Sequence, residues 1–238
     1  MIRYPDNMEP MDVDVRRKRA TDWLEAIYKD VQDIVVDNYV FWEVQEMVKA
    51  NNRLAKTPTI FKQWMASGFI QSAALSVRRQ ADKSDDCESL HRFLLEIKRW
   101  PGIVSRQSVQ DLYLRSNVDP TFAAELANSD YDRLIGPKLM EPKPESAQKE
   151  IDELLAKTGG IRHYVNRRVA HYDTRGIQQP LPTFNDLGEC LALFERLIKK
   201  YKTLLMGAGL TTLLPTFQYD WKAVFYFPWL DRLSPLDD

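Results

Sequence analysis

The residue types that could do chemistry gather in residues 163–173, which read His-Tyr-Val-Asn-Arg-Arg-Val-Ala-His-Tyr-Asp. Arg167 precedes His171 by four residues, so on a helix the two side chains lie one turn apart on the same face. Asp173 adds a carboxylate two residues later. A histidine exchanges protons near neutral pH, and an arginine binds phosphate and stabilises charge that develops on it. This stretch therefore combines groups that can bind a phosphodiester and move protons beside it.

Metal-independent cleavage of RNA is the reaction that needs such groups. It requires a base for the ribose 2′-hydroxyl, a cation for the charge on the phosphate, and an acid for the leaving oxygen. One arginine and one histidine supply only part of this set, and a two-fold related copy of the chain would supply more. The alternative interpretation is an ordinary surface helix, because a histidine four residues after an arginine is common.

A helix over 161–173 would sort these side chains by face. With about 100° per residue, four apolar side chains form the inward stripe: Ile161, Val165, Val169 and Tyr172. Tyr164 and Arg167 share the face of His171, which we expect to point away from the core and to suit a dimer cleft. Asn166 and Asp173 lie toward other sides.

The rest of the chain predicts helices that position this stretch. Apolar residues recur at three- and four-residue intervals, and glycine is scarce, with only nine residues. We expect helices over 15–35, 39–51, 59–83, 87–99, 145–158 and 183–205, two short helices within 105–140, and an irregular tail over 210–230 packed on the bundle. Helix 59–83 is apolar on most sides, which is typical of a central helix. Gly159 and Gly160 interrupt or kink the chain before 161–173, and Thr183 or Asn185 caps the last long helix.

The end of helix 59–83 is abruptly charged, with Arg78, Arg79 and Asp82. Arg78 and Asp82 are four residues apart and can form an ion pair. One interpretation is a plain ion pair at a helix end. The other is that Arg78 or Arg79 binds phosphate beside an active cleft, with Asp82 in a supporting role.

Composition limits the class of protein. The 238 residues carry a net charge of −1, so any contact with nucleic acid depends on a local basic patch. Cys87 and Cys190 are far apart in the sequence, and we expect both to be buried among apolar residues. We expect His91 and His163 to be plain surface or helix residues, and neither pair makes a metal site. No apolar run approaches the ~18 residues of a membrane span. We expect a cytoplasmic protein without cofactor or membrane contact, with a flexible stretch over 1–14 and one all-α domain over 15–230.

The sequence of residues 166–173 resembles the conserved helix of the HEPN superfamily and is most similar to its abortive-infection U-type branch. Three further stretches follow the order of that branch: 75–82, 89–95 and 183–229. The resemblance covers most of residues 15–230. It implies an all-α helical bundle, a homodimer and, in active members, a metal-independent endoribonuclease of phage defence, toxin–antitoxin systems or RNA processing.

The resemblance also implies site residues. His171 matches the family histidine and Asn166 the polar residue, but Val165 stands where the family has its arginine. Arg167 or Arg168 would replace that arginine in a shifted geometry, and Arg78 or Arg79 would replace it from a neighbouring helix. Arg162, nine residues before His171, is a poor substitute. Asp173 stands where some family toxins carry a tyrosine that a partner enzyme modifies.

Three hypotheses follow from the sequence. The first is an endoribonuclease in which His171 is the acid or base, Asn166 orients, and arginines bind phosphate, with Tyr164 and Asp173 in support. The second is a related module without catalysis that dimerises and binds RNA, a nucleotide or a protein. The third is an unrelated helical interaction protein. RNA, a second copy and an antitoxin protein are the expected partners.

Overall fold

The structure is a computed structural model, and it describes residues 12–56, 59–169 and 180–227. Helices dominate this part of the chain, and no strand occurs among the described residues. The expectation of an all-α bundle is therefore confirmed. The helices are α1 (Val13–Ala50), α2 (Asn52–Lys56), α3 (Ile60–Gln80), α4 (Leu90–Arg99), α5 (Arg106–Leu114), α6 (Pro120–Leu134), α7 (Pro144–Tyr164) and α8 (Phe184–Met206). Short turns complete the set: η1 (Pro101–Val104), the π-helical η2 (Val165–Val169) and η3 (Trp221–Tyr226).

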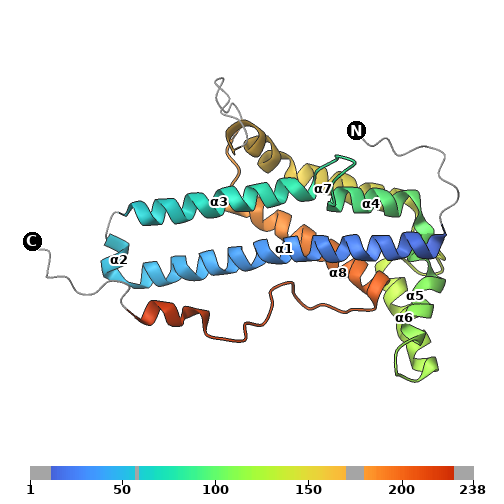
Figure 1. The fold of residues 1–238 in the computed structure, drawn as a ribbon. Helices are drawn as coiled ribbons and strands as arrows, with labels where there is room; N and C mark the ends of the chain where they lie inside the picture. The colour runs from blue at the N-terminus through green and yellow to red at the C-terminus, as the bar shows by residue number, and fades with distance from the viewer. Residues whose placement is uncertain (1–11, 57–58, 170–179, 228–238) are drawn as a thin grey trace, which may run out of the picture.

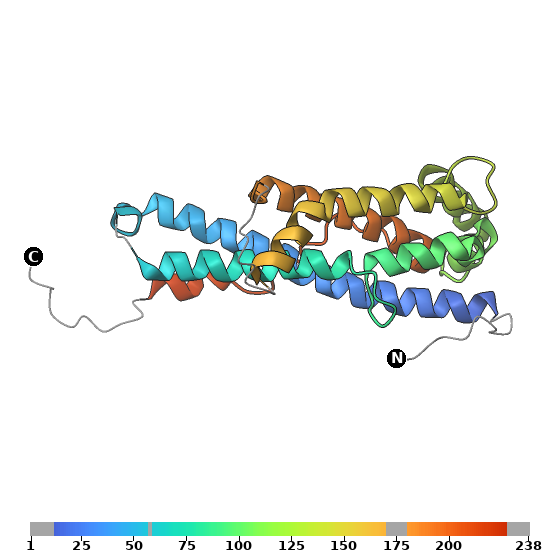
Figure 2. The same cartoon turned by 90° about the horizontal axis from the view of Figure 1, so that it is seen from above.

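The bundle is built around α1. Helices α3 and α4 follow each other nearly in line along α1, as Figures 1 and 2 show, and α8 packs on α1 beside them. Helix α7 packs against α3, α4 and α8, and the α5–α6 hairpin closes one end of the molecule (Figure 1). Because α7 spans the break between α3 and α4, its C-terminal end and η2 lie over the C-terminal half of α3.

Fully buried side chains at helical spacing hold these helices together. Helix α1 contributes Leu24, Ile27 and Val31, each at most 1% exposed, because the three face one side of the helix. The matching faces of the other helices contribute Phe93, Leu94, Leu154, Phe194, Leu197 and Ile198. Removing any one of the leucines to alanine is expected to cost about 2–5 kcal/mol in the free energy of unfolding.

Most predicted helix ends are correct because their caps are local. Thr183 caps α8: its hydroxyl accepts a hydrogen bond from the Asp186 amide at 3.2 Å, and its own amide donates to the Asp186 carboxylate at 2.6 Å. Asp119 caps α6, with Pro120 at the first helical position. After α8 the chain is irregular except for η3, as expected for the tail.

Three expectations about the helices are wrong. Helix α1 is continuous, whereas two helices were expected, because residues 36–38 contain no glycine or proline to end it. Helix α7 continues through Gly159 and Gly160, because helical neighbours on both sides hold them in the helix. Helix α4 begins at Leu90, capped by Ser89, so the half-exposed Cys87 lies in the preceding turn.

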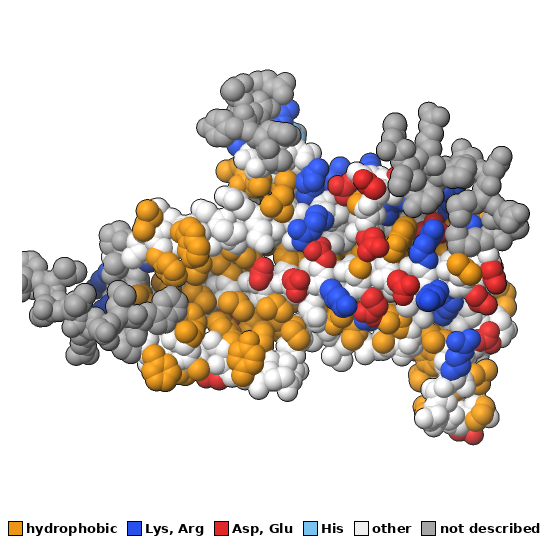
Figure 3. Space-filling model, viewed as in Figure 1, with side chains coloured by type: hydrophobic (Ala, Val, Ile, Leu, Met, Phe, Trp, Pro, Cys, Tyr) orange, Lys and Arg blue, Asp and Glu red, His pale blue; other side chains and the backbone are white. Residues whose placement is uncertain are grey.

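The apolar composition of helix 59–83 predicted a central helix, and this expectation is also wrong for α3. Ile60 is 85% exposed and Trp64 is 69% exposed, because its N-terminal half runs beyond α7 and α4. Figure 3 shows apolar side chains gathered over this half of α3 and the neighbouring end of α1, while charged side chains cover the other half of the molecule. Among the described residues no helix is both long and apolar enough to cross a bilayer.

Candidate functional site

The C-terminal end of α3 meets η2 through one side-chain hydrogen bond. Arg78 Nε donates to Asn166 Oδ1 at 2.9 Å, which joins residues 88 positions apart in the sequence. Asn166 is exposed because the buried Val165, with 0% exposure, points the opposite way into the core. The inward orientation predicted for Val165 is therefore confirmed. Single π-helical turns such as η2 are rare and occur frequently at functional sites.

Arg78 remains available to a ligand. Its side chain is 41% exposed, and its Nη1 lies 3.9 Å from Asp82 Oδ2, at the outer limit of an ion pair. Asp82 itself is held by the next turn, because its carboxylate accepts hydrogen bonds from the amide and the hydroxyl of Ser84 at 2.9 and 2.7 Å. These two bonds, more than Arg78, hold the pKa of Asp82 below its ordinary value. The predicted pair of Arg78 and Asp82 thus exists but is loose.

Arg79 is bound differently. Its guanidinium donates to both carboxylate oxygens of Asp30 on α1 and to Ser76 Oγ at 2.8 Å. Gln80 Nε2 donates to the same Asp30 at 2.6 Å. Arg79 therefore joins α3 to α1, and of the two arginines predicted to bind phosphate, Arg78 has the better geometry.

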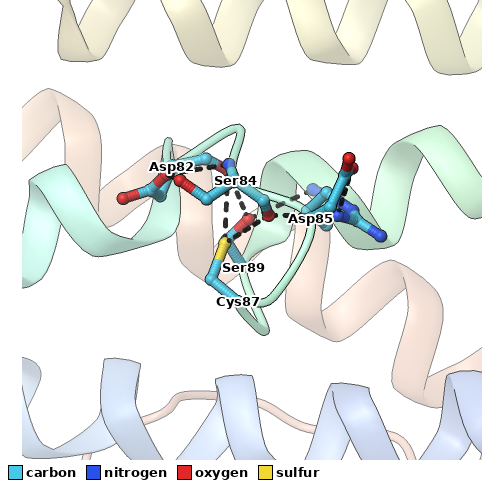
Figure 4. A network of polar contacts seen from close by, with 6 residues as sticks. Asp82, Ser84, Asp85, Cys87 and Ser89 are labelled. Carbon is cyan, nitrogen blue, oxygen red and sulfur yellow. Dashed lines mark hydrogen bonds and ion pairs between the residues drawn. The ribbon is translucent and has the colours of Figure 1, made fainter. Parts of the chain in front are cut away.

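The turn between α3 and α4 is fixed by the polar network drawn in Figure 4. Ser89 Oγ donates to the Asp82 carbonyl at 2.7 Å and accepts from the Arg92 amide at 3.2 Å, so it both caps α4 and closes the turn. Cys87 Sγ lies 3.0 Å from the Ser84 carbonyl. This network holds Asp82 and the residue after it, Lys83, at the end of α3.

His91 lies behind this turn. It is only 6% exposed, and its buried Nδ1 has no hydrogen-bond partner among the described residues. Burial lowers the pKa of His91 below its ordinary value, and the nearby charges of Lys83, Arg162 and Arg92 lower it further. The expectation of a plain surface or helix residue is wrong in one respect, since the imidazole is in a helix but buried.

Two cations of this region are not paired with a carboxylate of the described residues. Neither the exposed Lys83 nor the half-buried Arg162 forms a side-chain hydrogen bond or ion pair with any described residue. Arg162 lies four residues before Asn166, across the junction of α7 and η2. We call the group formed by Arg78, Lys83, His91, Arg162 and Asn166 the candidate site. It presents positive charge on a protein whose net charge is −1.

The family model described as AbiU2, an HEPN family, matches residues 18–224, which span α1 to η3. The chain belongs to the HEPN AbiU2 family. No curated protein and no solved structure matches it. Membership makes it an HEPN module related to abortive infection, and the matched residues include the whole candidate site.

The other predicted site residues of this AbiU2 chain are placed as follows. Arg167 and Arg168 lie in η2 and are half-buried. Tyr164 packs partly against the core, so its expected outward orientation is wrong, because α7 turns into η2 immediately after it. His171 and Asp173 lie outside the described residues. Within residues 12–56, 59–169 and 180–227 no three His, Cys, Asp or Glu side chains are grouped to hold a metal ion.

Three features of the candidate site were not predicted from the sequence of this AbiU2 chain: the burial of His91, the role of Lys83 and the position of Arg162. Signals existed for two of them. His91 is three residues before the core residue Leu94, which is the spacing of a buried helix face. Arg162 is one helical turn before Asn166, a spacing that places both on one face. Lys83 had no signal, because its effect on His91 arises only from packing.

Proposed function

We propose that this HEPN chain is a metal-independent endoribonuclease of phage defence or a toxin–antitoxin pair, in which Arg78 supplies the cation that Val165 cannot. One observation carries the proposal: the hydrogen bond from Arg78 Nε to Asn166 Oδ1 at 2.9 Å. It holds a half-exposed guanidinium against the polar residue of the family motif. A guanidinium in that place binds a phosphate and stabilises the charge that develops on it during cleavage.

The other residues take roles around Arg78. His171 is the acid or base, with Asp173 and Tyr164 in support. Asn166 uses its amide oxygen for Arg78 and keeps two N–H donors for the substrate. Arg167 and Arg168, like Lys83 and Arg162, bind the neighbouring phosphates of the strand. Arg79 keeps α3 in position through Asp30.

A second copy of the chain completes the catalytic set. We expect a homodimer that pairs the two segments containing residues 161–173, because one histidine cannot be both acid and base in a single step. A cytoplasmic setting and an antitoxin partner belong to the same proposal. The family match supports the abortive-infection context.

A specific observation favours a second candidate function. Val165 is fully buried at the family's arginine position, so its side chain does not contact a phosphate. The chain would then be a catalytically lapsed module that binds RNA, a nucleotide or a protein. In that case Arg78 contributes to binding but not to cleavage.

A cleavage assay separates the two candidates. The purified chain is incubated with single-stranded RNA in the presence of a chelator. We expect cleavage that disappears in His171→Ala and falls about 100-fold in Arg78→Gln. Arg99→Gln is the matched control, since Arg99 is an exposed arginine on α4 outside the candidate site, and it is expected to cleave normally.

The opposite results are equally informative. Equal cleavage by the intact chain and by His171→Ala excludes catalysis at His171. RNA binding that depends on Arg78, without any cleavage, establishes the second candidate function.

A further inference from the structure

A cavity lies one helical turn from Arg78. It has a volume of about 230 Å³, is partly open to solvent, and is lined by α3, α7 and the segment that leads into α8. Its walls are apolar, with Ala74 on α3, Ile161 and Tyr164 on α7, and Phe184 and Leu187 on α8. We call it the Tyr164 pocket. Pockets for drug-sized ligands measure about 300–1,000 Å³, so this one suits a single planar ring.

One wall of the Tyr164 pocket is a supported aromatic ring. Phe184 is 40% exposed, and its ring stacks on Phe41 with centroids 5.7 Å apart. Phe41 in turn stacks on Phe69 at 4.2 Å, and Trp42 meets Phe184 edge-on at 5.1 Å. The neighbouring rings fix Phe184 in place, so stacking a further ring on it costs little conformational entropy.

Tyr164 forms another wall and adds one polar group. Its side chain is half-buried against the core, and its hydroxyl has no hydrogen-bond partner among the described residues. The other hydroxyl at the pocket belongs to Thr183, which is engaged with Asp186. Among the side chains that line it, the pocket therefore offers apolar and aromatic surface and one hydroxyl without a partner in the described part of the chain.

The position of the pocket relates it to the candidate site. Ala74 and Arg78 lie one turn apart on α3, about 6 Å along the helix axis. On the other wall Tyr164 is two residues before Asn166, the partner of Arg78. This spacing is comparable to the separation between a base and the phosphate of its own nucleotide. A nucleotide whose phosphate binds Arg78 would thus place its base at the apolar Tyr164 pocket.

We propose that the Tyr164 pocket receives one unstacked base of a single-stranded RNA whose adjoining phosphate lies on Arg78. The inference rests on the proposed function in one respect, that RNA is the ligand. Unpaired bases stack on aromatic side chains in many RNA-binding proteins, and such stacking tolerates any base because each has a π-face. With one free hydroxyl, the pocket selects for the presence of a base far more than for its identity.

The experiment measures binding and does not depend on cleavage. Fluorescence anisotropy gives the dissociation constant of short single-stranded oligoribonucleotides, using the full chain carrying His171→Ala. In a series of oligonucleotides, one base at a time is removed to leave an abasic ribose. We expect one position at which the loss of the base weakens binding about tenfold. Replacing that base by any other is expected to change binding much less.

Two variants assign this effect to the pocket. Ala74→Leu fills the cavity, and Tyr164→Leu removes a ring from its wall. Both are expected to weaken binding of intact RNA about tenfold and to bind the abasic RNA no worse than the intact one. Tyr219→Leu is the matched control, since Tyr219 is 73% exposed and lies outside the pocket, and it should bind like the parent chain. Thermal melts verify that each variant is folded.

Each outcome decides between the pocket and the proposed function. The inference is overturned if no single base removal weakens binding, or if the weakening at one position persists unchanged in Ala74→Leu. In either case, binding that depends on Arg78 leaves the RNA proposal standing. An abasic effect that depends on the pocket supports the inference even if the cleavage assay is negative. If no single-stranded RNA binds, both are wrong.

Discussion

The groove between α6, α7 and α8 is basic like the candidate site, but its charges are arranged differently. Four cations line that groove, which has a volume of about 840 Å³, and each has a carboxylate beside it. The pairs are Arg133 with Asp130, Arg196 with Glu153, Lys199 with Glu195, and Lys200 with Glu150. We call this region the paired groove. At the candidate site Arg78 is bound to an amide and only loosely paired with Asp82, at 3.9 Å. Lys83 and Arg162 form no ion pair with any described residue.

The difference shows what makes a basic surface suitable for an anion. A paired cation has its charge neutralised nearby, so a phosphate gains little by approaching it and must compete with the carboxylate. An amide partner orients a guanidinium without neutralising it. We therefore expect the paired groove to contribute to stability and the candidate site to contribute to RNA binding.

The largest expected change in the free energy of unfolding comes from a residue at the centre of the paired groove. Glu150 is 9% exposed and accepts from the buried Tyr201 hydroxyl at 2.6 Å and from Lys200 at 2.8 Å. Glu150→Ala leaves both donors unpaired, so the free energy of unfolding should fall by about 3 kcal/mol in urea denaturation. Glu153→Ala is the control, because its pair with Arg196 is exposed and should contribute less than about 1 kcal/mol.

The same variant tests the comparison itself. Folded Glu150→Ala protein should bind single-stranded RNA with the affinity of the parent chain. A large loss of RNA affinity in Glu150→Ala would move the nucleic-acid surface to the paired groove.

A smaller effect is expected from neutralising the unpaired cations. Lys83→Gln with Arg162→Gln should leave the free energy of unfolding within about 0.5 kcal/mol, since both side chains lack partners among the described residues. The slope of log K for single-stranded RNA against log salt should become shallower by about 0.7 for each phosphate that the variant no longer neutralises. Arg196→Gln with Lys199→Gln is the matched control and should leave that slope unchanged. Equal slope changes in the two double variants would contradict the distinction between the regions.

The comparison also shows which features a sequence predicts. Local spacing correctly predicted the burial of Val165 and the pair of Arg78 with Asp82, because each depends on residues within one or two turns. It also limited the cap of α8 to Thr183 or Asn185, and the structure has Thr183. The bond between Arg78 and Asn166 was not predictable in detail. It depends on how α3 and η2 pack. From the sequence Arg167 was placed with the catalytic residues, and Arg168, Arg78 and Arg79 were placed as phosphate-binding residues.

Apolar composition was misleading for a related reason. Helix α3 is apolar on most sides, and from the sequence it was expected at the centre of the bundle. Its exposed Ile60 and Trp64 show that composition predicts which helix tends to be buried, but not whether another element covers that helix. The π-helical turn at η2 was likewise not predicted, because the 3.6-residue pattern continues through Val165 and Val169.

The smallest expected effect concerns His91 and the pH dependence of stability. Burial, then Lys83, Arg162 and Arg92, lower the pKa of His91 in the folded chain, and Asp82 opposes them only in part. In the unfolded chain His91 returns to its ordinary pKa near 6.5. Between the two values the unfolded state binds more protons, so stability falls as the pH drops below about 6.5, by at most about 1.4 kcal/mol per pH unit.

Urea denaturation at about pH 8 and about pH 5 measures this loss, and subtraction between variants isolates the contribution of His91. His91→Gln should lose less stability on acidification than the parent chain. Lys83→Gln with Arg162→Gln should also lose less, because removing the two positive charges raises the pKa of His91 toward its ordinary value. Arg196→Gln with Lys199→Gln should behave like the parent chain, since neither cation is among the charges that act on His91. If that control reduced the acid sensitivity as much as the Lys83 and Arg162 variant, the positive field at His91 would come from the whole protein, and the candidate site would have no local charge of its own.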